Sequence, residues 1–326
     1  MNFEFEKTLE PLRDEIATLE TKRLKGDGVA SSKLVTLRRK LETETERIYK
    51  TLTPWDEVQV ARHPGRPTIM QYATKMCDEF IELHGDRVFG DDKAMVGGLA
   101  KIGDKRFMLI GHRKGLTVEE NIAFNFGMAN PEGYRKAMRL MHLAEKWGIP
   151  VVTMVDTSGA YPGLEAEARG QAEAIGRNLM EMSALETPII TIVTGEGGSG
   201  GALGIAVGDR VLMLEHAVYS VISPEGCASI LWRDGTKAPE AAKALHITAK
   251  DLSELHVIDG IIPEPRGGAH CNQDETMENV KTALLEQMAA LSGLSASKLV
   301  DLRYKKYTAI GRFQPPTKQK TFSGNK

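Results

Sequence analysis

The stretch Pro188-Ile-Ile-Thr-Ile-Val-Thr-Gly-Glu-Gly-Gly-Ser-Gly-Gly-Ala-Leu-Gly204 passes from β-branched residues to glycines and then to small apolar residues. Its first part, Ile189–Thr194, has no polar alternation, which is typical of a strand buried on both faces of a parallel sheet. Five glycines follow between Gly195 and Gly201, and without Cβ atoms their backbone N–H groups are accessible at the start of a helix. This order of strand, loop and helix predicts an anion site, for a phosphate or for an oxyanion formed during a reaction.

A dinucleotide-binding motif shares these glycines. Gly195, Gly197 and Gly200 satisfy G-x-G-x-x-G, and Glu215 follows about 20 residues later, where such a fold places a ribose-binding acid. However, the helix-capable segment Ala202–Val207 is too short for the helix that crosses over in a βαβ unit. The dinucleotide interpretation therefore stays an alternative.

A second alternative is the nucleophile elbow G-x-S-x-G of serine hydrolases, which residues 197–201 satisfy with Ser199 as nucleophile. It requires an acid and then a histidine downstream, and Asp209 and His216 occur in that order. The phosphate loop G-x-x-x-x-G-K-[ST] is excluded, because Gly201 occupies the position of its lysine. In a purely structural interpretation, the glycines allow a helix and a sheet to touch, and we interpret Gly204 and Gly208 in this way.

The whole-chain composition is that of a globular protein. The 326 residues include 41% hydrophobic and 26% charged residues, with a formal net charge of -2, which gives no overall field to attract nucleic acid or an anionic membrane. Cys77, Cys227 and Cys271 are odd in number and form no C-x-x-C pair, which argues against disulfide frameworks and zinc sites. We expect a cytoplasmic protein, because the sequence contains neither a signal-like N-terminus nor 18 consecutive apolar residues.

Periodic leucines divide the N-terminal region from the rest. Apolar residues at three-four spacing in 9–19 and again in 34–52, separated by glycines, predict an antiparallel helical hairpin over 1–54. Such a hairpin serves either as a decorative arm or in assembly. Pro64 and Pro67 mark the start of a main domain over 55–270. We expect C-terminal helices over 271–310 and a disordered polar tail over 311–326.

The main domain repeats itself. Pro150–Val155 resembles Pro188–Val193 at an offset of 38 residues, and a glycine-bearing loop follows each segment. A helix over 165–185 is predicted between the two strands, and this α/β pattern indicates stacked superhelical turns or a doubly wound sheet. Upstream, the patterns predict a helix over 70–83, strands over 95–102 and 106–111, and a helix after Asn130.

The cationic run His112-Arg113-Lys114 follows the second of these upstream strands. Such a run is usually a solvated edge, but at the end of a strand it can also meet a phosphate or a carboxylate.

Six motifs in this order resemble the carboxyltransferase alpha subunit of bacterial and plastid acetyl-CoA carboxylase, and the resemblance extends from the hairpin to Gly268. They are Ala61-Arg-His-Pro-Gly-Arg-Pro67, Glu82-Leu-His-Gly-Asp-Arg87, Asn125-Phe-Gly-Met128 with Pro131-Glu-Gly-Tyr-Arg-Lys-Ala137, Asp156-Thr-Ser-Gly-Ala-Tyr-Pro-Gly163, Gly195-Glu-Gly-Gly-Ser-Gly-Gly-Ala202 and Tyr219-Ser-Val-Ile-Ser-Pro-Glu-Gly226.

The resemblance implies a crotonase-type superhelix of stacked ββα units behind the N-terminal hairpin. It also implies transfer of a carboxyl group from carboxybiotin, carried by a carrier protein, to acetyl-CoA. The product is malonyl-CoA, and the reaction is the first committed step of fatty acid synthesis. The site would lie between alpha and beta subunits of an alpha2beta2 complex that works with the carrier and biotin carboxylase.

The resemblance further implies that this chain binds no cofactor of its own, that zinc belongs to the beta subunit alone, and that the chain is inactive without that subunit. A plastid-encoded member would act in the plastid stroma. Two alternatives stay open at this point. One is a self-sufficient crotonase-fold acyl-CoA hydratase, isomerase or decarboxylase, and the other is a scaffold without catalytic activity.

The resemblance also assigns roles to residues. The amides of Gly200 and Gly201 would form an oxyanion hole for the biotin ureido oxygen. The biotin side of the site would be lined by Gly159, Ala160, Tyr161, Gly197, Gly198 and Arg169, although Arg169 would equally suit a structural ion pair. The biotin anion can take the methyl proton itself, so Glu196 and Glu225 are interpreted as helix-start acids before they are considered as acids or bases.

Overall fold

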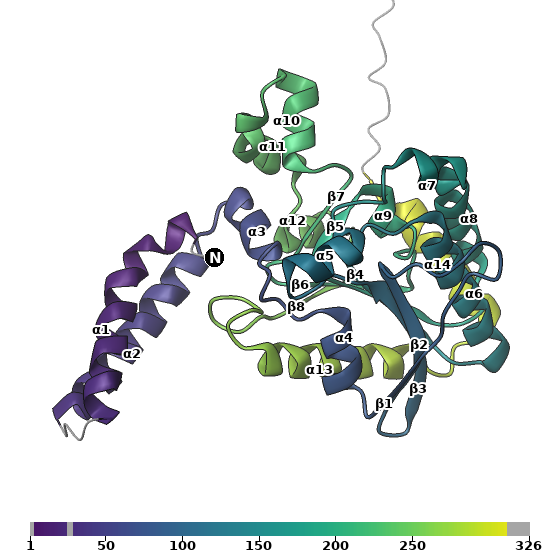
Figure 1. Ribbon diagram of the computed structural model, residues 1–326. Helices are drawn as coiled ribbons and strands as arrows, with labels where there is room; N and C mark the ends of the chain where they lie inside the picture. The colour runs from purple at the N-terminus through teal and green to yellow at the C-terminus, as the bar shows by residue number, and fades with distance from the viewer. Residues whose placement is uncertain (1–2, 25–28, 312–326) are drawn as a thin grey trace, which may run out of the picture.

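The computed structural model describes residues 3–24 and 29–311. Within them, eight strands form one mixed sheet in the order β1-β2-β3-β4-β5-β6-β8, and β7 pairs with the C-terminal part of β5 (Figure 1). The pairs β1–β2 and β2–β3 are antiparallel, and the later pairs are parallel. The strands are β1 Glu79–Glu82, β2 Met95–Ile102, β3 Lys105–His112, β4 Val151–Thr157, β5 Ile189–Gly198, β6 Arg210–Leu214, β7 Val218–Ser220 and β8 Gly260–Ile262.

Helices cover this sheet. In Figure 1, α13 runs beneath the sheet, while α6, α8 and α14 lie together at the far end from the N-terminus. The helices of the main body are α3 Pro54–Ala61, α4 Ile69–Gln71, η2 Tyr72–Met76, α5 Val118–Ala123, η3 Asn125–Gly127, α6 Pro131–Trp147, α7 Leu164–Ala168, α8 Gln171–Ala184, α9 Ser199–Leu203, α10 Pro224–Trp232, η4 Gly235–Lys237, α11 Ala238–Leu245, α12 Ala249–Glu254, α13 Gln273–Leu291 and α14 Ala296–Ala309.

The two repeated segments pair directly with each other. In the parallel pair β4–β5, Val151 lies opposite Ile189 and Val152 opposite Ile190, so the register of the sheet equals the sequence offset. Nearly all positions of both strands are buried, as the lack of polar alternation predicts. The one polar pair inside, Thr153 and Thr191, is satisfied by a hydroxyl hydrogen bond of 2.9 Å. The repeat therefore places two equivalent strand ends, with their glycine loops, side by side.

Two expected helices differ in the structure. The helix predicted over 70–83 ends at Met76, and Glu79–Glu82 forms the edge strand β1 instead, with alternating exposed and half-buried residues. The helix predicted over 165–185 is broken into α7 and α8 at Gly170, which has a left-handed φ of 85°. In both cases tertiary contacts with neighbouring elements outweigh helix propensity, which is a weak determinant over so few residues.

The N-terminal region forms two long helices that project from the body in Figure 1, α1 Glu10–Leu24 and α2 Val29–Tyr49, preceded by η1 Glu4–Leu9. Contacts between α1 and α2 include an ion pair of Arg38 with Glu20 at 2.6 Å. Phe3 and Tyr49 bury their rings against Val60 of α3, which anchors the helix pair to the main domain. The expected hairpin turn falls partly outside the described residues, and the expected domain boundaries stay a prediction.

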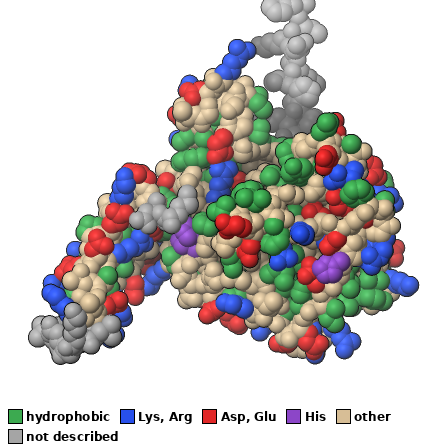
Figure 2. Space-filling view, in the orientation of Figure 1, with side chains coloured by type: hydrophobic (Ala, Val, Ile, Leu, Met, Phe, Trp, Pro, Cys, Tyr) green, Lys and Arg blue, Asp and Glu red, His purple; other side chains and the backbone are tan. Residues whose placement is uncertain are grey.

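The C-terminal helices belong to the core. Val280 and Leu284 of α13 and Leu299 of α14 are buried in the same apolar cluster as the sheet. The tail expected to be disordered lies outside the described residues from residue 312 onward. Acidic and basic side chains alternate over the surface in Figure 2, in line with the small net charge. None of the described helices is long and apolar enough to cross a membrane.

Candidate active site

The glycine segment is a strand for longer than expected. Gly195–Gly198 continues β5, paired with β4 on one side and with β7 on the other, and α9 begins only at Ser199. The prediction of a loop at 195–198 is therefore wrong. Glycine is required here for close approach of neighbouring chains, because a Cβ on Gly198 would lie 2.1 Å from the carbonyl oxygen of Ser158. A Cβ on Gly195 would lie 2.5 Å from Asp156 Oδ1.

The turn into α9 carries the two glycines expected to stabilise an oxyanion. Gly201 is buried, and a Cβ on it would lie 2.3 Å from the carbonyl carbon of Gly159 and 2.4 Å from the nitrogen of Ala160. Gly200 is half-buried, and its nearest neighbour in the direction of a Cβ is the side chain of Ile175 at 3.8 Å. The structure therefore brings Gly159 and Ala160 against Gly201, the juxtaposition that the sequence repeat predicts.

The other predicted biotin-side residues make contacts with other parts of the protein. Gly197 lies in β5, and a Cβ on it would lie 2.8 Å from the ring of Tyr219. The backbone N–H of Tyr161 donates to the carbonyl of Ala129 at 3.0 Å. Arg169 donates to Glu132 at 3.0 Å, which is the structural ion pair considered from the sequence. Substrate contacts by Tyr161 and Arg169 stay predictions.

The structure does not support the serine hydrolase or the dinucleotide-binding interpretation of this segment. Ser199 has a left-handed φ of 51° after the strand, but the two downstream residues needed for a hydrolase triad are paired elsewhere. Asp209 accepts from Arg303 at 2.8 Å, and the His216 ring lies 2.9 Å from a Glu57 carboxylate oxygen. The dinucleotide interpretation fails because residues 195–198 are strand and α9 has only five residues. Backbone donors at the turn remain as the chemistry that the segment can supply.

Two cavities lie near these strand ends. A polar cavity of about 470 Å³ is lined by residues that include Arg62, Lys114, Asp156, Ser158 and Glu196. An apolar cavity of about 330 Å³ is lined by residues of the turn and its surroundings, including Gly200, Leu203, Tyr219, Val221 and Leu255. Gly200 is thus accessible from an apolar hollow, where a hydrogen bond to a developing charge is stronger than in water.

Arg62 at the end of α3 joins two acids that the sequence interpretation treated separately. Its Nη2 donates to Glu196 at 2.7 Å and its Nη1 to Glu225 at 2.6 Å. Burial would raise the pKa of Glu225, but the hydrogen bond and charge of Arg62 outweigh it and hold that pKa below its usual value. Glu225 lies in the first turn of α10, as expected. The same expectation is wrong for Glu196, which belongs to strand β5.

The cationic run after β3 is not a solvated edge. His112 is buried, Arg113 lies over the Phe124 ring at 4.0 Å, and Lys114 donates to Asp156 at 2.6 Å. Asp156 also accepts the backbone N–H of Glu196 at 3.0 Å. Lys114 therefore meets a carboxylate of the protein, and this ion pair ties the end of β3 to the ends of β4 and β5.

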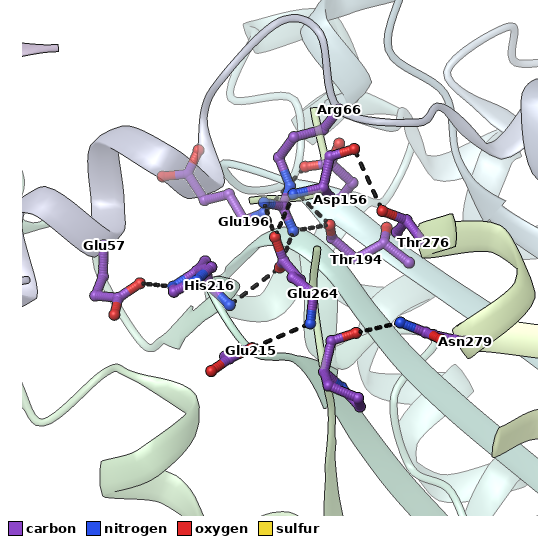
Figure 3. Close-up of polar contacts among 12 residues, drawn as sticks. Glu57, Arg66, Asp156, Thr194, Glu196, Glu215, His216, Glu264, Thr276 and Asn279 are labelled. Atoms are coloured by element: carbon purple, nitrogen blue, oxygen red, sulfur yellow. Dashed lines mark hydrogen bonds and ion pairs between the residues drawn. The ribbon is translucent and has the colours of Figure 1, made fainter. Parts of the chain in front are cut away.

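A second, buried ion pair contacts β5 just before its glycine segment (Figure 3). Arg66 donates to Glu264 at 2.6 Å and to the carbonyl of Thr194 at 2.9 Å. Burial alone would raise the pKa of Glu264, but Arg66 lowers it below its usual value. Burial alone would lower the pKa of His216, yet the hydrogen bond with Glu57 and nearby carboxylates raise it. Sequence reasoning missed Arg62 and Arg66 as organising residues, although both lie in the Ala61–Pro67 motif.

The residues described by the structure contain no group of three or more His, Cys, Asp or Glu arranged to hold a metal ion. Cys77 and Cys227 are buried free thiols, and Cys271 is a third free thiol.

Solved structures with a similar fold indicate the fold class of this chain. The transcarboxylase 12S subunit matches with a TM-score of 0.54 and 17% identity, covering 79% of this chain and 44% of that chain. The beta subunit of geranyl-CoA carboxylase from P. aeruginosa matches with a TM-score of 0.54 and 17% identity, covering 76% of this chain and 46% of the other. A malonate decarboxylase hetero-tetramer from Pseudomonas matches with a TM-score of 0.55 and 15% identity, covering 66% and 86%. The chain thus has the crotonase-type fold of the carboxyltransferases and spans less than half the length of the first two proteins.

Sequence relatives narrow the class to one family. The protein named acetyl-coenzyme A carboxylase carboxyl transferase subunit alpha from Geobacter metallireducens is 54% identical over 95% of this chain and 97% of its own length. The protein of the same name from Thermus thermophilus is 51% identical over 97% of this chain and 100% of its own. Residues 2–311 match the family described as acetyl co-enzyme A carboxylase carboxyltransferase-like, and the chain belongs to that family.

Proposed function

We propose that this chain is the alpha subunit of an acetyl-CoA carboxylase carboxyltransferase. It transfers the carboxyl group from carboxybiotin to the methyl carbon of acetyl-CoA and so forms malonyl-CoA, the first committed step of fatty acid synthesis. The observation that carries the proposal is the near-full-length likeness to relatives of that name. Two of the motifs behind the family resemblance, 156–163 and 195–202, lie at the ends of β4 and β5, where these strands meet the glycine turn.

The turn suits the charge that develops in this reaction. When carboxybiotin releases CO2, negative charge collects on the ureido oxygen, and backbone amides at Gly200 and Gly201 can receive it without side-chain chemistry. Gly200 borders the apolar hollow, and the absence of a Cβ lets a bicyclic ring approach the backbone closely. The Gly159–Ala160 loop fixes the other side of the turn. These contacts support an oxyanion hole made of backbone donors.

No protein base is required for the proton transfer. The ureido anion that remains after loss of CO2 takes a proton from the methyl group of acetyl-CoA, and the resulting carbanion attacks CO2. The two nearby acids are poorly suited to this task, because Arg62 binds both Glu196 and Glu225. The lowered pKa of Glu225 also makes it a weak base at neutral pH. We therefore assign both acids to support of the site.

The partners follow from the same proposal. A beta subunit would supply the acyl-CoA side of the site in an alpha2beta2 complex, and zinc would belong to that subunit. A biotin carboxyl carrier protein would deliver carboxybiotin that a biotin carboxylase has made. We place the reaction in the cytoplasm, or in the plastid stroma for a plastid-encoded chain.

The test is co-expression of this chain with a beta subunit, followed by measurement of malonyl-CoA formation from acetyl-CoA and carboxylated carrier protein. We expect turnover that depends on both the carrier and the chain. The competing assignment, a self-sufficient acyl-CoA enzyme of the same fold, predicts that the purified chain alone hydrates an enoyl-CoA or decarboxylates malonyl-CoA. Such activity without the beta subunit would replace our proposal.

A further inference from the structure

Helix α9 is too short and too rich in glycine to hold its own geometry. It consists of five residues, Ser199–Leu203, and two of them are glycine. Isolated helices of this length are unstable, and glycine disfavours the helical state further. An oxyanion hole, however, requires donors held within fractions of an ångström of a fixed position. The direction of the α9 amides must therefore be set by contacts from other elements.

Tyr134 of α6 supplies such a contact. Its hydroxyl donates a hydrogen bond of 3.1 Å to the carbonyl oxygen of Gly201, and the side chain is fully buried. Its ring lies against Gly204, where a Cβ would approach two ring carbons at 2.8 Å. Burial raises the pKa of Tyr134 well above its usual value, so the hydroxyl keeps the proton that it donates.

Asn178 of α8 fixes the same assembly from the other side. Its Nδ2 donates to the carbonyl oxygens of both Tyr134 and Gly204, each at 3.0 Å, and the side chain is 1% exposed. The side-chain amide of Asn178 thus links Gly204, which follows α9, to Tyr134, which contacts the first turn of α9. Because the network is buried and hydrogen-bonded, it has little freedom to shift.

His112 at the end of β3 is buried near the backbone of Gly201. Both ring nitrogens are buried and have no hydrogen-bond partner within the described residues. Burial lowers the pKa of His112 to about 4, and the backbone of Gly201 opposes this shift. At neutral pH the ring is uncharged, and the hydrogen bond that the structure shows at the Gly201 carbonyl comes from the Tyr134 hydroxyl.

We propose that Tyr134 is a positioning residue for the carboxyl transfer. Its hydroxyl fixes the peptide plane that follows Gly201, and with it the first turn of α9 and the direction of the Gly200 and Gly201 amides. The inference rests on the proposed function, since it assumes that these amides stabilise the ureido oxyanion. It adds a residue that touches neither substrate and acts only through the Gly201 carbonyl.

The test compares two conservative variants in the complex with the beta subunit, Tyr134→Phe and Tyr72→Phe. Tyr72 is the matched control, because it is equally buried but its hydroxyl has no hydrogen-bond partner in the described part of the chain. We expect Tyr134→Phe to lower kcat roughly ten- to a hundredfold. This loss does not exceed the loss of kcat expected when a whole oxyanion donor is removed. The KM for acetyl-CoA should stay within about twofold, since a loosened turn affects the transition state and not acyl-CoA binding. Tyr72→Phe should keep the wild-type kcat.

A second variant keeps the proposal testable if Tyr134→Phe does not fold. Gly204→Ala removes no polar group but forces the Tyr134 ring away from α9, and we expect a similar loss of kcat. The double variant Tyr134→Phe/Gly204→Ala should lose little more than either single variant, because both act through one contact. Wild-type kcat in folded Tyr134→Phe or in Gly204→Ala would overturn the positioning role alone. An inactive wild-type complex would instead refute the proposed function together with this inference.

Discussion

Gly198 and Gly201 are glycine because of what lies beside them, since neither has a left-handed backbone. A side chain at either position would collide with the main chain of the loop after β4, at Ser158 for Gly198 and at Gly159 for Gly201. Ser199 between them is the residue with the unusual backbone, at a φ of 51°. At this scale the backbone of the turn therefore packs directly against the backbone of the loop after β4, and we propose that its amides are the functional groups.

The variant Gly201→Val tests this interpretation. Its branched Cβ would meet the Gly159–Ala160 backbone at about 2.3 Å, so the turn must move and an oxyanion donor is displaced. We expect the rate of malonyl-CoA formation in the complex to fall about a hundred- to a thousandfold, the loss seen when one oxyanion donor is removed.

Ser199→Ala is the control for that experiment. The acid and the histidine that a triad would need, Asp209 and His216, are paired with Arg303 and Glu57, so this variant should keep most of the activity. An inactive but folded Ser199→Ala would restore the hydrolase-elbow interpretation, and an active Gly201→Val would remove the turn from the mechanism.

At the scale of elements, α3 is the joint between the N-terminal helices and the site. One side of α3 contacts Phe3 and Tyr49 through Val60, while Arg62 at its end binds Glu196 and Glu225. Glu57 of α3 also contacts His216 after β6. Displacement of α3 would therefore disturb both the anchoring of α1 and α2 and the ion pairs beside the glycine turn.

The His216–Glu57 contact gives α3 a pH-dependent attachment. The folded-state pKa of His216 lies above its usual 6.5, so the folded protein binds this proton more tightly than the unfolded chain does. The contact contributes its full stability below about pH 6.5 and loses it as pH rises through the folded-state pKa. We expect wild type to lose roughly 1–2 kcal/mol of unfolding free energy relative to Glu57→Gln over that interval. Urea unfolding at pH 6 and pH 9 measures this difference, and parallel pH profiles of the two proteins would refute it.

Removal of residues 1–50 addresses the N-terminal helices. We expect the main core to form without them, because the described residues of this region that are buried against the main domain belong to the small cluster around Phe3 and Tyr49, which is separate from the main cluster. We expect the shortened chain to keep the circular dichroism and a cooperative unfolding transition of the main domain but to bind the beta subunit more weakly. Unchanged affinity, measured by titration calorimetry, would show that the helix pair does not serve assembly.

Sequence periodicity predicted some of these elements and not others, for physical reasons. The 38-residue repeat predicted the pairing of β4 with β5, because equivalent apolar runs occupy equivalent registers. It could not show that Gly195–Gly198 stays in the strand, since glycine has low strand propensity and pairing with β7 depends on distant residues. The edge strand Glu79–Glu82 was missed because its four residues alternate too briefly to separate from a helical pattern. Arg62 was missed because its two carboxylate partners are 134 and 163 residues away.

At the scale of the whole molecule, we propose that the glycine turn forms a complete site only with a second protein. Two parts project from the body in Figure 1, the helices α1 and α2 and the pair α10 and α11. Large apolar side chains are exposed on α10, at Ile230 and Leu231, and in the segment before it, at Val221. Apolar side chains exposed in such numbers are typical of a protein interface. Together with the oxyanion donors that we propose for the turn, this shape favours one subunit of a two-subunit carboxyltransferase.

That central claim is tested most directly by steady-state malonyl-CoA synthesis from acetyl-CoA and carboxylated carrier protein, measured with the pure chain, the pure beta subunit and the two combined. The account predicts turnover by the combined subunits and almost none by the chain alone, because in our proposal the chain supplies the biotin side of the site and its partner the acyl-CoA side. Synthesis of malonyl-CoA by the pure chain at the rate of the complex would contradict it.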